Sequence, residues 1–256
     1  MTELDVAREA ARAAAKILAN YRFSRPTAIN SKSAANDLVT EVDGACEAAI
    51  RDVFQKHTPD IHVLGEEGGG DSAAPTRWVV DPIDGTTNFV HGFPYYAVSI
   101  GLQVDGIAEV GLVLSATGEE YSAARGKGTF SNERRLRVSD CRTLDAALLG
   151  TGFPYVARPD HERILAIWRS MLLKTHGIRR PGAASLDLAQ VAAGAFDGFW
   201  EFHLGPWDVA GGRLLVEEAG GRVSAIGGGP LADTDVSILA SNGWLHDQIQ
   251  AVIDEP

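Results

Sequence analysis

The residues best suited to chemistry lie in one stretch, Asp81–Phe89, which reads D-P-I-D-G-T-T-N-F. Asp81 follows the apolar run Trp78–Val80, so we expect it where a buried strand ends and a loop begins. Asp84 comes three residues later, and two carboxylates at this spacing can face one small volume. Hard divalent cations such as Mg²⁺ take oxygen ligands, commonly a few carboxylates together with a substrate phosphate. The stretch therefore predicts a cation site that adjoins a phosphate.

The next two residues, Gly85 and Thr86, are candidates for the phosphate itself. We expect them to begin a turn or a helix, where free backbone N–H groups favour an anion. The same letters also fit an ordinary strand–turn–helix junction, because Asp-Gly is a common turn and Asp is a good helix N-cap. The stretch alone does not separate these interpretations, so acids elsewhere in the chain must decide.

Glu66 and Glu67 form the second acidic group. They stand between a short predicted strand, Ile61–Leu64, and a run of glycines. Adjacent acids in such a loop are more often simply solvated. If this strand lies beside Trp78–Val80 in one sheet, however, its end brings Glu66 close to Asp81, and ligands commonly collect at strand ends.

Asp208 and Asp43 are the remaining acidic candidates. Asp208 falls in the first turn of a predicted helix, Pro206–Ala219, where any acid would compensate the helix dipole. It could equally supply a third carboxylate to the cation from the other half of the chain. Asp43 stands three residues after Thr40, which predicts a capping box at the start of a helix.

The elements that must position these residues follow from hydrophobic periodicity. Helical spacing predicts helices at Leu4–Asn20, from near Thr40 to Phe54, and at Asp160–Leu173, Ala184–Ala193, Pro206–Ala219 and Trp244–Ile253. Strands are predicted at Ile61–Leu64, Trp78–Val80, Tyr95–Val104, Ile107–Leu114, Glu120–Ala124, Thr129–Phe130, Leu136–Val138, Leu148–Thr151, Gly177–Arg180, Phe199–Phe202 and Val236–Ala240. A meander followed by strand–helix alternation indicates layered sheets and helices. We expect a single domain over 1–256, with an α+β half at about 1–142 and an α/β half at about 143–256.

Composition excludes several classes of protein. The formal net charge is −11 and no long basic run occurs, so we expect no nucleic-acid surface. The two cysteines, Cys46 and Cys141, have no metal-ligand spacing, which suits a reducing cytoplasm. We expect no signal peptide, no membrane span and a cytoplasmic protein. Neither nucleotide-binding glycine motif is present.

Three segments together resemble the inositol monophosphatase family of Mg²⁺-dependent, lithium-sensitive phosphatases. They are Gly65-Glu66-Glu67, the Asp81–Phe89 stretch, and W-D-V-A-G-G at 207–212. The likeness extends to D-L-V-T-x-x-D at 37–43 and to 90–101 and 177–182, and 151–154 and 199–208 look most like bacterial members. It implies an αβαβα sandwich of the inositol monophosphatase and fructose-1,6-bisphosphatase type, a symmetric dimer, and hydrolysis of a phosphomonoester by a metal-activated water.

The resemblance also implies roles for individual residues. Two or three Mg²⁺ ions would be held by Glu66, Asp81, the carbonyl of Ile83, Asp84 and Asp208. The attacking water would be oriented or deprotonated by Asp43 and Thr86, with Glu66 assisting through a further ion. The substrate would contact the amides of Gly85 and Thr86 through its phosphate, and Asp84, Gly182, Ala183, Ala184 and Glu201 through its alcohol. Lys32 would line the entrance, and Glu67 would be a nearby ligand or support one.

Two positions depart from the family pattern, and both lie near the expected alcohol pocket. Ala183 stands where many relatives carry a hydroxyl residue, and Gly205 stands where relatives often carry His, Lys or Arg. The favoured substrate is myo-inositol 1-phosphate or a similar polyol phosphate, because the Glu201 carboxylate can accept hydrogen bonds from vicinal hydroxyls. The alternatives are histidinol phosphate, fructose 1,6-bisphosphate and 3′-phosphoadenosine phosphates, or a metal-binding interaction protein without turnover.

Overall fold

The computed structural model spans residues 1–256 and describes all of them except 22–28, 32–37, 155–158, 232–233 and 235. Its helices are α1 (Glu3–Ala19), α2 (Glu41–His57), α3 (Thr86–His91), α4 (His161–Lys174), α5 (Ala184–Ala192), α6 (Pro206–Glu218) and α7 (His246–Asp254). Its strands are β1 (Ile29–Ser31), β2 (Leu38–Thr40), β3 (His62–Gly65), β4 (Thr76–Asp84), β5 (Ala97–Val104), β6 (Ile107–Ser115), β7 (Glu120–Ala124), β8 (Gly128–Ser131), β9 (Arg134–Arg135), β10 (Leu148–Thr151), β11 (Gly177–Arg179), β12 (Gly198–Leu204), β13 (Arg222–Ala225) and β14 (Val236–Ser241).

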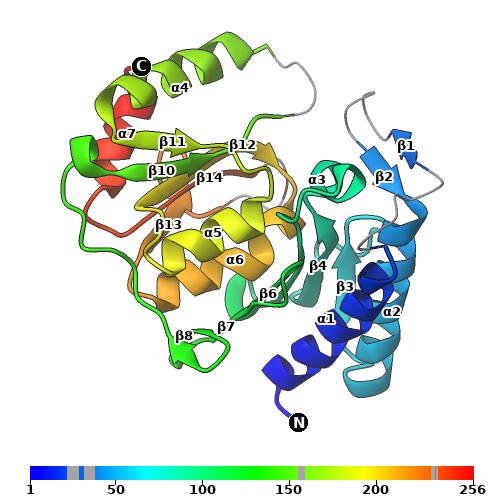
Figure 1. Cartoon of the computed structure of the whole chain (residues 1–256). Helices are drawn as coiled ribbons and strands as arrows, with labels where there is room; N and C mark the ends of the chain where they lie inside the picture. Colours follow the sequence, from blue (N-terminus) through cyan, green and yellow to red (C-terminus); the bar gives the residue numbers. More distant parts are fainter. Residues whose placement is uncertain (22–28, 32–37, 155–158, 232–233, 235) are drawn as a thin grey trace.

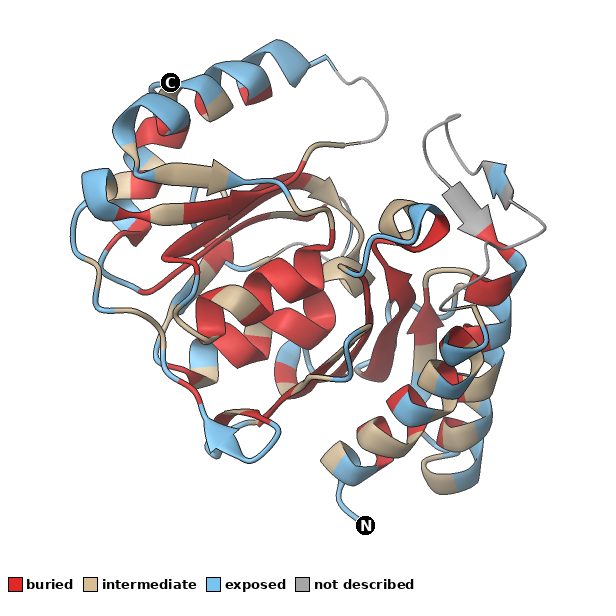
Figure 2. Ribbon diagram, viewed as in Figure 1, coloured by how far each residue is buried: buried red, intermediate tan, exposed pale blue. Residues whose placement is uncertain are grey.

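Helices and sheets alternate in layers (Figure 1). Helices α1 and α2 pack on one face of a seven-stranded sheet, and α5 and α6 fill the space between that sheet and a five-stranded one. Helices α4 and α7 cover the outer face of the five-stranded sheet. The predicted αβαβα sandwich is therefore confirmed. Figure 2 shows the consequence for burial: the central helix α5 is buried on nearly all sides, whereas α1 and α2 bury only one face.

The order of strands places the acidic segments together. In the seven-stranded sheet the order runs from β3 to β9 in sequence, and only β3 and β4 pair in parallel. This parallel register sets Gly65 opposite Val80, so the residue after β3 comes level with Asp81. The pairing on which the interpretation of Glu66 depended is therefore present. The five-stranded sheet has the order β11-β10-β12-β14-β13.

Helix α6 lies directly on the sheet with almost no side chain between the two backbones. A Cβ atom at Gly101 on β5 would approach the Ala210 carbonyl oxygen to 2.5 Å, and one at Gly111 on β6 would approach the Gly211 carbonyl oxygen to 2.5 Å. Real Cβ atoms are not found this close, so only glycine allows the contact. Because Asp208 is in the first turn of α6, this packing sets its height above the sheet.

Three differences from the predicted elements have physical causes. Leu136–Val138 is not a strand, because its amides bond to different partners: Leu136 to the Thr129 carbonyl and Val138 to the Ala219 carbonyl. The prediction that the strand ends at Asp81 is also wrong, since β4 continues pairing with β5 through Asp84. The short strands β1, β2 and β13 carry too few alternating residues to be recognised. In the part of the chain that the structure describes, no helix is long and apolar enough to cross a membrane.

Candidate metal centre and active site

Asp81, Asp84 and Asp208 converge on one point. Each offers one carboxylate oxygen, and these three atoms lie within 4.8 Å of one another. Residues three apart on a regular strand would face opposite sides of the sheet. The register of β4 against β5 shifts between Asp81 and Asp84, however, and this irregularity lets both carboxylates share one side. Ser99 lies opposite Asp81 on β5 and donates to the Trp207 carbonyl at 3.2 Å, which anchors the residue before Asp208.

The electrostatics of this cluster call for positive charge. Burial and the charges of Glu66, Asp84 and Asp208 raise the pKa of Asp81, and burial with the charges of Glu66 and Asp84 raises that of Asp208. Burial also raises the pKa of Asp84 to about 6, against hydrogen bonds from Ser185 and Ala184 that lower it. Buried carboxylates that repel one another are stabilised by a hard cation with oxygen ligands. The donor set therefore fits a divalent cation such as Mg²⁺.

Glu66 reaches this cluster through the parallel pairing of β3 and β4. Its N–H donates to the Val80 carbonyl at 3.1 Å. Besides burial, the charge of the Glu66 carboxylate is one of the causes that raise the pKa of Asp81, which places Glu66 beside the cluster. A cation between the two carboxylates would offset their repulsion.

Asp43 and Thr86 meet beside the cluster. The Thr86 hydroxyl lies 3.2 Å from Asp43 Oδ1 and 3.0 Å from the Ile83 carbonyl oxygen, and can donate to one at a time. The other Asp43 oxygen accepts from the Thr40 N–H at 2.9 Å and the Thr40 hydroxyl at 2.6 Å. The predicted capping box of α2 is confirmed. Because the cap uses only one of its oxygens, Asp43 also fixes the Thr86 hydroxyl.

Asp84 caps a helix that lies 100 residues further along the chain. One carboxylate oxygen accepts from the Ala184 N–H at 3.2 Å, and the other accepts from the Ser185 N–H at 2.7 Å and from the Ser185 hydroxyl. The N-cap residue of α5, Ala183, has no side-chain acceptor of its own. The Ala184 amide is thus already engaged with Asp84, and a substrate would compete for it. Sequence reasoning missed Ser185, whose only signal is a hydroxyl in the first turn of a helix of small residues.

Among the residues expected at the alcohol, Gly182, Ala183 and Ala184 lie at the start of α5, and Glu201 lies on β12. A Cβ atom at Gly85 would lie 3.1 Å from both the Ala183 Cβ and the Gly182 carbonyl oxygen, so these segments adjoin. The Glu201 carboxylate lies against the backbone of Gly152, where any side chain would overlap it. Burial raises the pKa of Glu201 to about 8, although the charge of Arg180 acts to lower it. Arg180, predicted only as the end of a strand, is therefore a missed neighbour of this site.

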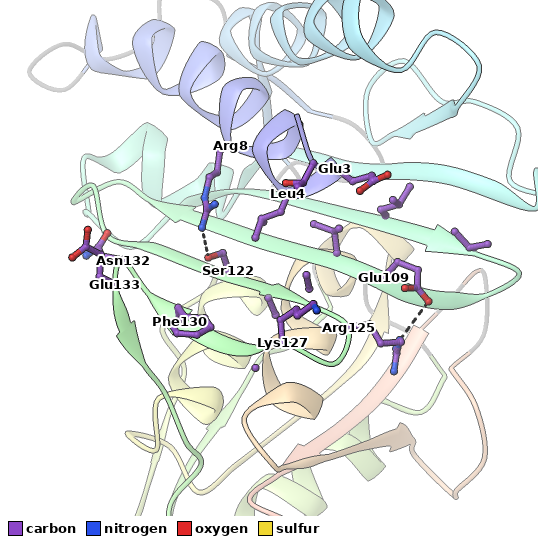
Figure 3. Close-up of a pocket in the computed structure, with 17 residues that line it drawn as sticks. Glu3, Leu4, Arg8, Glu109, Ser122, Arg125, Lys127, Phe130, Asn132 and Glu133 are labelled. Atoms are coloured by element: carbon purple, nitrogen blue, oxygen red, sulfur yellow. Dashed lines mark hydrogen bonds and ion pairs between the residues drawn. The ribbon is translucent and has the colours of Figure 1, made fainter.

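Two predicted residues remain, Lys32 and Glu67. Lys32 lies outside the described residues. Glu67 donates its backbone N–H to Glu47 at 2.8 Å, which holds the turn after β3. A cavity of about 750 Å³ lies elsewhere, between the start of α1 and the outer face of strands β5 to β8, and none of the predicted site residues lines it (Figure 3).

Comparisons with known proteins match the whole chain. A family profile described as "Inositol monophosphatase family" covers residues 1–255. The "Nus factor SuhB" of Pseudomonas aeruginosa is 47% identical over 229 residues, which are 86% of this chain and 84% of that protein. The "Inositol-1-monophosphatase" of Caulobacter vibrioides is 45% identical over 252 residues, 94% of this chain and 96% of that protein.

A solved structure extends this likeness to three dimensions. The extragenic suppressor protein suhB from Bartonella henselae superposes with a TM-score of 0.92 at 37% identity, covering 98% of each chain. The acids gathered at β4 and α6 thus occur in a sequence and a fold that both match one group of phosphatases over almost their full length. This chain belongs to the inositol monophosphatase family.

Proposed function

We propose that this phosphatase hydrolyses myo-inositol 1-phosphate, or a similar polyol phosphate, with Mg²⁺ as its cofactor. The convergence of Asp81, Asp84 and Asp208 within 4.8 Å is the observation that carries the proposal. The name of the Caulobacter relative, inositol-1-monophosphatase, supports the substrate class. Cations held by these acids, by Glu66 and by the Ile83 carbonyl would supply charge neutralisation of the phosphate and acidify a coordinated water.

The chain's own residues prepare the attack. When the Thr86 hydroxyl donates its hydrogen bond to Asp43, its lone pairs can accept a hydrogen bond from a water. A proton from that water can then pass through the Thr86 hydroxyl to the buried carboxylate of Asp43, whose second oxygen is held by Thr40. We assign the pair to orienting the water and removing its proton.

The phosphate and the alcohol are assigned to two adjoining segments. Gly85 precedes α3 with a φ of +91° and no side chain caps this end of the helix, so the amides of Gly85 and Thr86 are assigned to the phosphate. Gly182, Ala183, Ala184, Glu201 and Asp84 are assigned to the alcohol. Near neutral pH a Glu201 with a pKa of about 8 carries a proton, so it can donate to one hydroxyl oxygen and accept from another.

The test is phosphate release across a panel of substrates with Mg²⁺ titrated from zero. The panel contains myo-inositol 1-phosphate, histidinol phosphate, fructose 1,6-bisphosphate and 3′-phosphoadenosine phosphate. We expect Mg²⁺-dependent turnover that is fastest on the inositol ester and falls at least about 100-fold in Asp81→Asn and Asp208→Asn, since each removes a charged ligand. A preference above tenfold for another ester would identify that ester as the substrate instead. Near-normal turnover in both variants would reject the mechanism.

A second candidate function comes from the Pseudomonas relative, whose name is Nus factor SuhB. Such a role is distinct from hydrolysis. We would introduce this chain, active or as Asp81→Asn, into Pseudomonas aeruginosa cells that lack their own protein. Equal rescue by both forms would support a function independent of turnover, and rescue by the active form alone would tie the function to hydrolysis.

The oligomeric state and the compartment stay predictions. We propose a homodimer in the cytoplasm, as the family resemblance and the two free cysteines suggest. Light scattering on the purified chain measures the first, and fractionation of cells the second.

A further inference from the structure

We propose that Glu47 and Arg51 of α2 are positioning residues for the metal centre, holding the turn that carries Glu66. This inference rests on the proposed function, in which Glu66 is a cation ligand. It concerns residues that neither the sequence motifs nor the comparisons single out.

The Glu47 carboxylate organises the backbone of the turn after β3. It is only 2% exposed, and accepts from the Glu67 N–H at 2.8 Å through one oxygen and from the Gly68 N–H at 2.9 Å through the other. The two preceding amides donate to backbone carbonyls: Gly65 N–H to Gly69 within the turn, and Glu66 N–H to Val80 on β4. Four successive amides around Glu66 thus have acceptors, and Glu47 supplies two of them.

Arg51 completes the support one helical turn further on. Its Nε donates to Glu47 at 2.7 Å, and its terminal nitrogens donate to the Gly69 carbonyl at 2.6 Å and the Val63 carbonyl at 3.4 Å. The guanidinium thus pairs with the buried carboxylate and bonds to the backbone on both sides of the turn, at Val63 and at Gly69. A buried carboxylate with such hydrogen-bond partners keeps its geometry.

Two glycines of the turn allow the Glu47 carboxylate to approach the backbone. A Cβ atom at Gly65 or at Gly68 would overlap the Glu47 carboxylate, so the backbone can approach only as glycine. The glycines beside Glu66 thus leave room for the Glu47 carboxylate against the backbone of the turn.

Helix α2 consequently serves the site twice. Asp43, which fixes Thr86, and Glu47 are four residues apart, so they lie on one face of the helix. One rigid element therefore sets the position of Glu66 relative to the Asp43–Thr86 pair. Groups that orient metal ligands typically change metal affinity by about 10–100-fold when altered.

The experiment measures Mn²⁺ binding by calorimetry on the full chain, with turnover at saturating Mg²⁺ recorded alongside. Glu47→Gln replaces one acceptor oxygen by an amide NH₂ that faces an N–H donor. We expect its dissociation constant for Mn²⁺ to rise at least about tenfold, while kcat at saturating metal stays within about threefold, because excess metal reforms the site. Arg51→Lys keeps the charge but loses the fork of donors, and should raise the constant by about threefold.

The matched control is Asp52→Asn, which removes the same charge from the exposed side of the same helix. It should leave Mn²⁺ affinity unchanged within about twofold. If Glu47→Gln does not fold, as judged by circular dichroism, the Arg51→Lys result decides. A Glu47→Gln constant within about twofold of the wild type would overturn the inference.

A double-mutant cycle tests whether Glu47 acts through Glu66. In a Glu66→Gln background, adding Glu47→Gln should weaken Mn²⁺ binding by no more than about twofold; a further tenfold loss would place the effect elsewhere and overturn the inference. Absence of Mn²⁺ binding to the wild type would instead reject the proposed function. Weakened binding in Glu66→Gln with normal binding in Glu47→Gln would reject only the role of Glu47.

Discussion

At the scale of single residues, Glu201 has the most informative protonation state. It is 9% exposed, and burial raises its pKa from an ordinary 4.5 to about 8. The charge of Arg180 opposes this rise and that of Asp84 adds to it. A carboxylic acid that is neutral at pH 7 differs from a carboxylate as a recognition group, because it has a donor as well as acceptors. We therefore expect the discrimination among alcohols that is proposed for Glu201 to depend on pH.

The same residue makes stability depend on pH. Because the folded pKa is raised, its contribution to stability is fully present below pH 4.5 and is lost as pH rises through about 8. At about 1.4 kcal/mol per pH unit, the loss across this window is at most about 5 kcal/mol. We expect the free energy of unfolding of the metal-free wild type to fall relative to Glu201→Gln between pH 5 and about 9, measured by urea titration. Parallel profiles would show that Glu201 is already ionised at neutral pH.

At the scale of elements, the site depends on how β4 turns into α3. Gly85 has a φ of +91°, and a Cβ atom there would lie 3.1 Å from Ala183 and Gly182 of the other half of the chain and from the Tyr95 carbonyl oxygen of its own half. Asn88 on α3 strengthens the same junction, donating to the Tyr95 carbonyl at 2.7 Å and the Pro181 carbonyl at 2.8 Å. The turn thus joins the two groups of strands where the substrate is proposed to bind.

Two glycines at the ends of α3 allow a matched comparison. Gly85→Ala adds both an unfavourable φ and a Cβ 3.1 Å from three neighbours, so we expect turnover to fall at least about tenfold and stability by about 1–3 kcal/mol. Gly92→Ala has a similar φ, +71°, but its Cβ meets nothing within 4 Å. It should lose about 1 kcal/mol of stability and keep its kcat. Equal kcat values in the two variants would mean that the turn is not part of the site.

The sequence predicted the site better than the exact elements that carry it. The order of acids and glycines indicated Asp81, Asp84, Asp208 and Glu66, and the structure brings these side chains together. It did not reveal that β4 runs on to Asp84, because the register shift depends on pairing with β5. Nor did it reveal Ser185 or Glu47, since each acts through a partner about 20 to 100 residues away in the chain.

At the scale of the whole molecule, the cation is expected to stabilise the fold as well as catalyse. Burial and mutual repulsion raise the pKa of Asp81, Asp84 and Asp208, so the metal-free protein is least stable when all three are ionised. Asp81 and Asp84 lie on β4, whereas Asp208 lies on α6, far along the chain. A ligand held between β4 and α6 therefore restrains the packing of the central layer against the sheet.

Thermal unfolding with and without Mg²⁺ measures this stabilisation. At a free concentration 100 times the dissociation constant, binding adds about 2.7 kcal/mol. For a domain of this size we expect the melting temperature to rise by roughly 5–10 °C at pH 8. Asp208→Asn, which removes a ligand but also a repulsive charge, should melt higher than the metal-free wild type and gain little from Mg²⁺. An equal gain in both proteins would place the stabilising ion elsewhere.

The backbone contact between α6 and the sheet has a consequence for which ion the protein accepts. Mg²⁺ sits about 2.1 Å from its oxygen ligands and Ca²⁺ about 2.3–2.6 Å, so a difference of a few tenths of an ångström separates the two ionic radii. The gap between β4 and the first turn of α6 is fixed by main-chain atoms meeting at Gly101 and Gly111, which yield less than side chains would. We therefore expect discrimination by ion size to depend on β5 and β6, which bear none of the proposed ligands, and we expect bulk added at these glycines to widen the gap toward the larger ion.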